Sequence, residues 1–71
     1  MEKIRILYDE MSNTLDVWLK KPQKTVSEET GKEIILKKNN KGEVVGFEIL
    51  NYLPAGKKLK RIPVEFAMSS Q

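Results

Sequence analysis

The chain has 71 residues, with 13 Lys and Arg against 10 Asp and Glu, a formal charge of +3, and neither cysteine nor histidine. This length is that of a single domain, and a domain so small buries only about 60% of the surface of its unfolded chain, so association would add stability. Without cysteine there are no disulfides or thiolate zinc sites, and without histidine the commonest general base and transition-metal ligand are missing. We therefore expect no enzyme, no cofactor and no metal site.

No apolar run follows Met1, because charged residues intervene at positions 2, 3 and 5. Elsewhere no stretch reaches the roughly 18 consecutive apolar residues that suggest a membrane-spanning helix. The charge is spread along the chain, which keeps a small protein soluble. We expect residues 1–71 to form one soluble, cytoplasmic domain without membrane contact.

Apolar residues at every second position predict a β-hairpin over residues 3–8 and 14–20. The alternating side chains are Ile4, Ile6, Tyr8, Leu15, Val17 and Leu19. A period of two places them on one face of each strand, and the polar residues 9–13 between the strands are typical of a turn. Pro22 ends the second strand, because proline has no amide hydrogen for the ladder.

Residues 23–32 are predicted to cross between two hairpins without forming a strand. They are polar, with Val26 as their only aliphatic residue, so this segment has no face to bury. A short apolar strand follows at 33–38, and the next turn ends on Gly42, which accepts a left-handed backbone without steric cost. Residues 43–50 return as the fourth strand.

Both faces of this sheet are predicted to carry apolar side chains. The principal face holds Ile4, Ile6, Tyr8, Leu15, Val17, Leu19, Val45, Phe47 and Ile49. The second face holds Leu7, Trp18, Ile35, Val44 and Leu50 among the charged residues Arg5, Asp16 and Glu48. Because a sheet with two partly apolar faces is not stable alone in water, we predict that the second apolar set is an oligomer or partner interface. Trp18 is expected either beneath the end of its own chain or against a partner.

The apolar faces of the sheet must be covered either by residues 52–71, which form a C-terminal arm, or by another chain. Two spacings describe this segment: helical, through Leu59, Ile62 and Phe66, or strand-like, through Ile62, Val64 and Phe66. Pro63 favours the extended form, because inside a helix it would cost about 3 kcal/mol. The pattern leaves open whether residues 57–67 are strand or helix.

Acidic residues offer two candidate sites. Asp9, Glu10 and Asp16 flank one turn, and carboxylates of this kind bind Mg²⁺ or Ca²⁺. The Asp-x-Asp-x-Asp-Gly spacing of calcium loops is absent, so we interpret them as a solvated turn. Glu48 lies between two apolar residues, where desolvation raises the pKa of a carboxyl as in some catalytic sites. No second acid or nucleophile is fixed beside it, so we interpret Glu48 as a cross-strand partner of Arg5 or of another cation.

Two runs of cationic residues are candidate contacts for nucleic acid. They are Lys57, Lys58, Lys60 and Arg61 in the arm, and Lys37, Lys38 and Lys41 at the opposite turn. Such residues bind phosphates with release of counterions. No aromatic residue is interleaved with either run, and lysines at sheet edges also prevent aggregation. Nucleic-acid binding through the arm is therefore the alternative to binding a protein.

Four blocks of sequence follow one another in a specific order. They are Tyr8-Asp9-Glu10, Leu15-Asp16-Val17-Trp18-Leu19, Gly31-Lys32-Glu33-Ile34-Ile35-Leu36 and the run from Gly42 to Asn51. Together, over roughly residues 3–51, they resemble the domain-of-unknown-function family 2283. The resemblance implies a small β-rich fold without an established activity, and some members look like the antitoxin half of toxin–antitoxin gene pairs. The family's second turn is usually acid-rich, whereas residues 37–41 carry three lysines here, and the arm lies outside the shared pattern.

The sequence thus predicts a mainly β protein, a four-stranded antiparallel meander of two hairpins. Its C-terminal arm packs on the sheet or exchanges between chains, and a homodimer is the favoured assembly. The predicted function is non-catalytic binding by an interaction module, with neutralisation of a small protein toxin as its candidate role. Nucleic-acid binding through the basic arm is the alternative.

Overall fold

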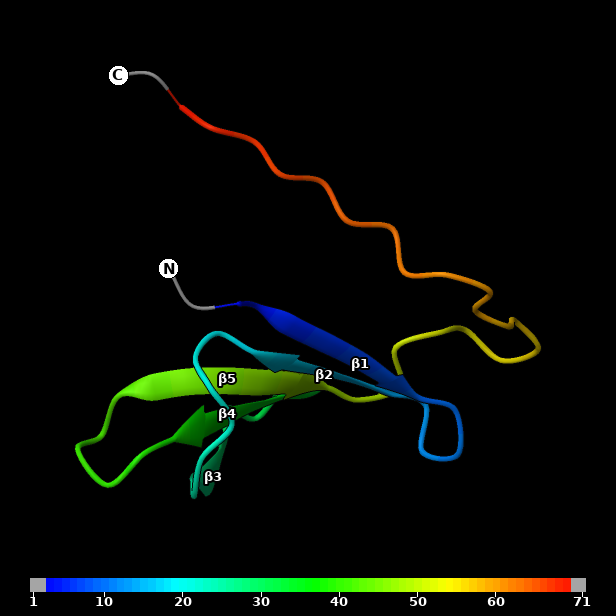
Figure 1. The fold of residues 1–71 in the computed structure, drawn as a ribbon. Coiled ribbons are helices and arrows are strands. Elements are labelled where there is room, and N and C mark those ends of the chain that lie inside the picture. Colours follow the sequence, from blue (N-terminus) through cyan, green and yellow to red (C-terminus); the bar gives the residue numbers. More distant parts are fainter. Residues whose placement is uncertain (1–2, 70–71) are drawn as a thin grey trace.

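Five antiparallel strands form one sheet in the computed structural model, which describes residues 3–69 (Figure 1). They are β1 Arg5–Asp9, β2 Thr14–Trp18, β3 Val26–Glu29, β4 Ile34–Lys38 and β5 Val44–Ile49. The described residues form no helix, and hence none that could span a membrane. The prediction of a mainly β, antiparallel protein is confirmed, and the hairpins β1–β2 and β4–β5 are present.

The prediction of four strands is wrong, because residues 26–29 of the expected polar crossing form β3. All four residues are exposed, and the strand pairs with β4 alone at one edge of the sheet. Backbone hydrogen bonds hold such an edge strand, so it needs no apolar alternation and its sequence gives no period-two signal. The turn into β4 contains Gly31 at φ 81°, and the Thr30 hydroxyl donates to the Ile34 carbonyl oxygen at 2.8 Å.

The strand order, β1-β2-β5-β4-β3, also differs from a sequential meander. Strand β2 pairs with β5, the last strand in the chain, so that β4 and β3 lie beyond β5. Residues 19–25 carry the chain from β2 to the far edge. The central place suits β5, because its Val45 is fully buried, with 0% exposure.

Cross-strand pairing aligns one apolar face of the sheet. Two rows of paired residues form it, namely Ile6, Val17, Phe47 and Leu36, and Tyr8, Leu15, Ile49 and Ile34. We call these eight residues the apolar face. Of them only Leu15 and Val17 are buried, and no helix or second sheet of the described chain covers the others.

A β-bulge between β4 and β5 shifts the register at Lys37 and Lys38. Lys37 pairs with Gly46 and Lys38 with Val44, so Val45 is the extra residue on β5. A bulge breaks the alternation of the strand that contains it. Val44 pairs with Lys38, whose side chain lies on the opposite face from Lys37, so Val44 does not share the face of Trp18 on which simple alternation placed it.

The C-terminal arm leaves the sheet at Tyr52 and runs clear of it, as neither strand nor helix over residues 52–69 (Figure 1). Residues 70 and 71 of the predicted arm lie outside the described residues. The start of the arm is fixed, since the Tyr52 amide donates to the Asn13 carbonyl oxygen at 3.0 Å. Farther along, Leu59 and Ile62 are half-buried and the other residues from Pro54 to Ser69 are exposed. The arm has the extended form that Pro63 favoured, without strand pairing.

Candidate functional site

Lys37 lies at the centre of the second face of the sheet and is only 6% exposed. Its Nζ contacts Oδ1 of Asp16 and lies 3.8 Å from Oε1 of Glu48. The same Nζ lies 4.1 Å from the centre of the Trp18 ring, a cation–π geometry. We call Asp16, Trp18, Lys37 and Glu48 the Lys37 cluster.

Gly46 makes room for the Lys37 side chain. The register places Gly46 between Trp18 on β2 and Lys37 on β4. A Cβ atom at position 46 would lie 3.2 Å from Cδ of Lys37 and 2.5 Å from the carbonyl oxygen of Val17. The aliphatic stem of Lys37 therefore occupies the space above the glycine, and its ammonium group reaches the indole.

Trp18 is thus covered by Lys37 of its own chain, a residue that the sequence analysis assigned to a cationic turn. The sequence predicted that the C-terminal arm or a partner would cover Trp18. Gly46, a glycine inside a strand and next to an aromatic residue, is the signal that could have identified Lys37 as the cover. Glu48 has a cross-strand cation, as predicted, and that cation is Lys37. No buried side-chain nitrogen or oxygen of the described residues lacks a hydrogen-bond partner.

The acidic residues are engaged in local structure. Oδ1 of Asp9 accepts from the amides of Met11 and Ser12 at 3.0 and 3.4 Å, as in a backbone-bonding turn. Asp16, predicted to flank the same turn, pairs with Lys37 instead. Within the described part of the chain no three metal-ligating acids gather. The Lys37 cluster joins one cation to two carboxylates, so the buried ammonium charge is compensated within the sheet.

The structure brings together only part of the predicted interface. Leu7 and Ile35 flank Asp16 and Glu48 in one cross-strand row, which ends at Glu29 on β3. Trp18 lies in the next row. Leu7 is 49% exposed, while Ile35 and Trp18 are partly buried. Val44 is moved away by the bulge, and Leu50 lies beyond the end of β5, where its amide donates to the Glu33 carbonyl oxygen at 2.8 Å. Charged groups thus divide this face, which is less apolar than predicted.

The two cationic runs are far apart and unequal. All four cations of the arm, Lys57, Lys58, Lys60 and Arg61, are exposed. None of them takes part in an ion pair among residues 3–69. The turn with Lys41 (green in Figure 1) lies at the opposite end of the molecule from residues 57–61 (orange). This second run offers fewer free cations, because Lys37 is buried and Lys38 pairs with Glu28 at 3.1 Å.

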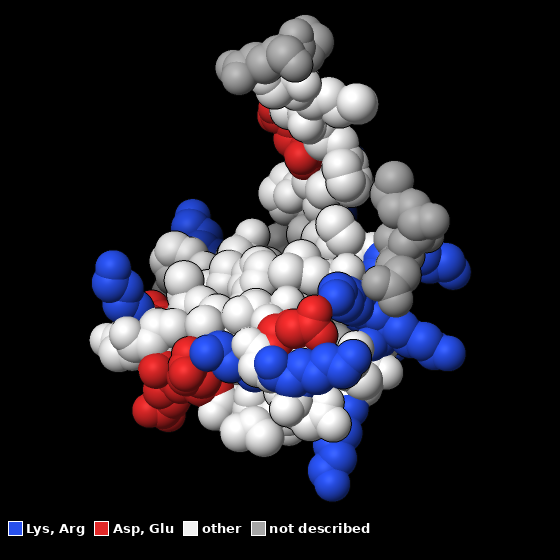
Figure 2. All heavy atoms as spheres, turned by 90° about the vertical axis from the view of Figure 1, so that its left-hand side faces the viewer, with Lys and Arg blue, Asp and Glu red and all other residues white. Residues whose placement is uncertain are grey.

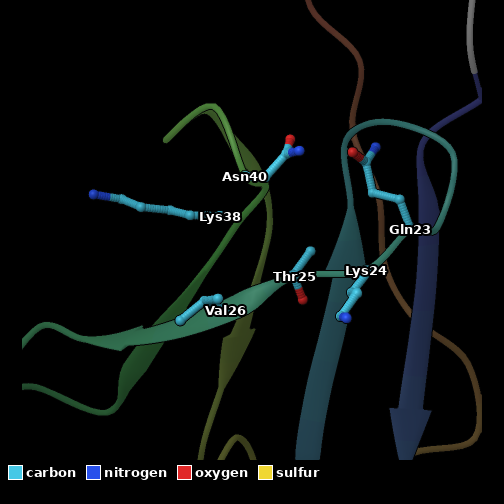
Figure 3. Close-up of a pocket in the computed structure, with 6 residues that line it drawn as sticks. All are labelled: Gln23, Lys24, Thr25, Val26, Lys38 and Asn40. Carbon is cyan, nitrogen blue, oxygen red and sulfur yellow. The ribbon is translucent and has the colours of Figure 1, made fainter.

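Two open hollows flank the crossover from β2 to β3. The larger, of about 450 Å³, is lined by Gln23, Lys24, Thr25, Val26, Lys38 and Asn40 (Figure 3). In Figure 3 the amide groups of Gln23 and Asn40 point toward each other, while Lys38 points away from the hollow. The smaller, of about 380 Å³, is lined by Lys3, Arg5, Lys21 and Pro22. Both offer hydrogen-bond donors, and neither contains a carboxylate or a nucleophile paired with a base.

The apolar face is only partly covered by its own chain. Its Ile34 is 38% exposed, and five others of its eight side chains remain partly accessible. In Figure 2 uncharged surface covers much of the upper body beneath the arm, and charged side chains gather below it and to the sides. Sequence analysis identified most of this face from the alternation, but it did not identify Ile34 and Leu36, because the β4 pattern favoured Ile35.

One family model matches this chain. The model of the family described as protein of unknown function (DUF2283) matches residues 5–52, from the first residue of β1 to the residue whose ring packs on Tyr8. No curated protein matches the chain, and no solved structure does. The match confirms the resemblance noted in the sequence and leaves the arm from residue 53 outside the shared region.

Proposed function

Since the chain belongs to the DUF2283 family, described as proteins of unknown function, we propose that it is a non-catalytic interaction module that works as a homodimer. The exposed surface of the single chain carries this proposal. The chain exposes 6332 Å², whereas a folded monomer of 8.2 kDa exposes about 4500 Å². The difference, about 1800 Å² per chain, falls within the range buried by permanent dimers.

The dimensions of the chain support the same proposal. Its radius of gyration is 13.7 Å, while a compact domain of 71 residues has one of about 11 Å. Three hydrophobic residues, Leu15, Val17 and Val45, are buried among those described, which is a small core for an independent domain. A second copy provides the missing cover without any further component.

The polar groups favour binding over catalysis. The most buried charge, Lys37, is neutralised by Asp16 and Glu48, and the two hollows are open and lack an acid–base pair. A chain without cysteine also fits a cytoplasmic setting, since small secreted domains usually depend on disulfides. We therefore assign the protein a binding role in the cytoplasm.

Multi-angle light scattering at micromolar concentrations tests the homodimer. We expect a mass of twice 8.2 kDa, independent of dilution over at least about tenfold. A mass of 8.2 kDa that does not rise with concentration would contradict the proposal. The apolar face would then be available to a different protein, for which the small toxin suggested by the family resemblance is the candidate, to be tested by titration with the purified toxin.

Nucleic-acid binding is the second candidate function, because the four cations of the arm are exposed and without carboxylate partners among residues 3–69. Binding to mixed-sequence DNA or RNA should then be measurable at about 50 mM salt and fall steeply as salt rises. Replacement of Lys57, Lys58, Lys60 and Arg61 by Gln should reduce the salt slope. Replacement of four exposed lysines outside the arm, Lys21, Lys24, Lys32 and Lys41, by Gln is the matched control. Absence of binding at low salt would contradict this function.

A further inference from the structure

The arm presents an exposed apolar stripe near its end. Val64, Phe66 and Met68 are 52%, 83% and 98% exposed. They alternate with Pro63, Glu65 and Ala67, and in an extended segment a period of two places the three large side chains on one side. Water-exposed Phe and Met side chains in a row are uncommon on a monomer and are typical of an interface.

The apolar face has the width that this stripe requires. Its eight residues lie on four strands, β1, β2, β5 and β4, which have three spacings of about 4.8 Å, so the face is roughly 14 Å across. Residues 62–68 in extended form span about 20 Å. The arm is therefore long enough to cross the whole face, with its side chains between those of Phe47, Leu36 and their neighbours.

The arm does not cross the sheet of its own chain. Its first residues are fixed at the β1–β2 turn, through the bonds of Tyr52 and Leu53 to Asn13. Leu59 and Ile62 are half-buried, but beyond Ile62 the arm stands away from the body (Figures 1 and 2). A segment that covers the face of a sheet makes no ladder hydrogen bonds, so Pro63, which lacks an amide hydrogen, does not prevent this placement. Glu65, on the other side of the arm, would face solvent.

We infer that, in the homodimer, residues 62–68 of each chain lie across the apolar face of the other, with Val64, Phe66 and Met68 against that face. This inference rests on the proposed function and names the occupant of its interface. The exchange is reciprocal, so one two-fold axis closes the assembly. It covers both exposed apolar surfaces of the chain at once, the face and the stripe.

Light scattering over a dilution series of two full-length variants tests this inference. Phe66→Asp places a charge in the stripe and should raise the dissociation constant of the dimer about 30-fold or more, as expected when an aromatic anchor is lost. Glu65→Gln, on the other side of the arm, should leave it unchanged. If the wild type is a dimer and Phe66→Asp dissociates no more readily, the arm is not the occupant and the inference is wrong, while the homodimer stands. If the wild type is a monomer, the homodimer is wrong as well.

Cross-linking gives a second readout that does not depend on the stability of a charged variant, and the chain has no cysteine of its own to interfere. An Ile34→Cys chain mixed with a Phe66→Cys chain and treated with a short bis-maleimide should give a mixed dimer, identified by mass. Ser27→Cys on the opposite face replaces Ile34→Cys as the control, because Ser27 pairs with Lys37. Equal yields from the two mixtures, or a link formed only within a chain that carries both Ile34→Cys and Phe66→Cys, would overturn the inference.

Discussion

The side chain of Asn13 bonds both backbone polar groups of Leu53, a residue 40 positions away. Its Nδ2 donates to the Leu53 carbonyl oxygen at 2.9 Å, and its Oδ1 accepts from the Leu53 amide at 3.0 Å. The same Oδ1 accepts from the Tyr8 hydroxyl at 2.7 Å. Asn13 has φ 54°, a conformation that Asn tolerates better than most residues. One residue thus shapes the first turn and sets the direction in which the arm leaves.

Asn13→Ala should lower the free energy of unfolding by about 1–3 kcal/mol, because Leu53 and Tyr8 lose their partners and alanine is strained at positive φ. Urea denaturation measures this loss, and limited proteolysis at the arm lysines should also become faster. Asn13→Gly removes the same bonds and tolerates the backbone, so the difference between the variants isolates the strain. An unchanged midpoint in both would show that the Asn13 bonds do not hold the arm.

The cation–π pair of Lys37 and Trp18 should appear as a coupling in a double-mutant cycle. We expect Lys37→Met and Trp18→Leu to be coupled by about 1 kcal/mol, since the pair is partly desolvated. Lys37→Met alone should cost about 1–3 kcal/mol, because Asp16 and Glu48 remain near each other without their cation. Thermal or urea unfolding of the four proteins gives both numbers, and strict additivity would argue against the pair.

Gly46→Ala should destabilise the sheet by about 1–3 kcal/mol, although glycine is a poor strand former. The reason is steric, because the added Cβ would meet the backbone oxygen of Val17 at 2.5 Å and would force β2 and β5 apart. Ser27→Ala, at an exposed position of β3, is the comparison and should change little. Amide hydrogen exchange should show loss of protection along the β2–β5 ladder, and a stabilised Gly46→Ala protein would refute this account.

The pKa of Glu43 should lie below the ordinary value of a glutamate. Asn39 Nδ2 donates to its Oε1 at 2.9 Å, which is the main cause, and Lys20 Nζ lies 3.6 Å from its Oε2. Because the folded state favours the ionised form, Glu43 contributes to stability above its ordinary pKa, and this contribution is lost as the pH falls through the lowered value. NMR titration of the Glu43 carboxyl should show the low midpoint in the wild type and a higher one in Asn39→Ala. Equal midpoints would exclude the hydrogen bond as the cause.

Sequence patterns identified the strands that contribute to the apolar face and missed features that depend on backbone pairing alone. Ile6 and Tyr8 in β1, and Leu15 and Val17 in β2, occupy every second position, which predicts the first hairpin because all four share the apolar face. Strand β3 has no covered face, and hydrogen bonds to β4 hold it, so no periodicity marked it. The pairing of β2 with β5 is a non-local choice that spacing does not encode. The Lys37 cluster escaped prediction for the same reason, since the pairing and the bulge bring Lys37 over Gly46.

The burial of Lys37 gives the sheet a chemical reporter of its own. Amine-reactive reagents modify the neutral amine form of accessible lysine side chains, and the Lys37 side chain, 8% exposed, lies against an indole and two carboxylates. Its acylation therefore requires β4 and β5 to open locally, whereas Lys57, Lys58 and Lys60 on the arm are modified without any opening. Pulse labelling followed by mass spectrometry can thus time the opening of the central ladder in the unmodified protein, with the arm lysines as the internal reference.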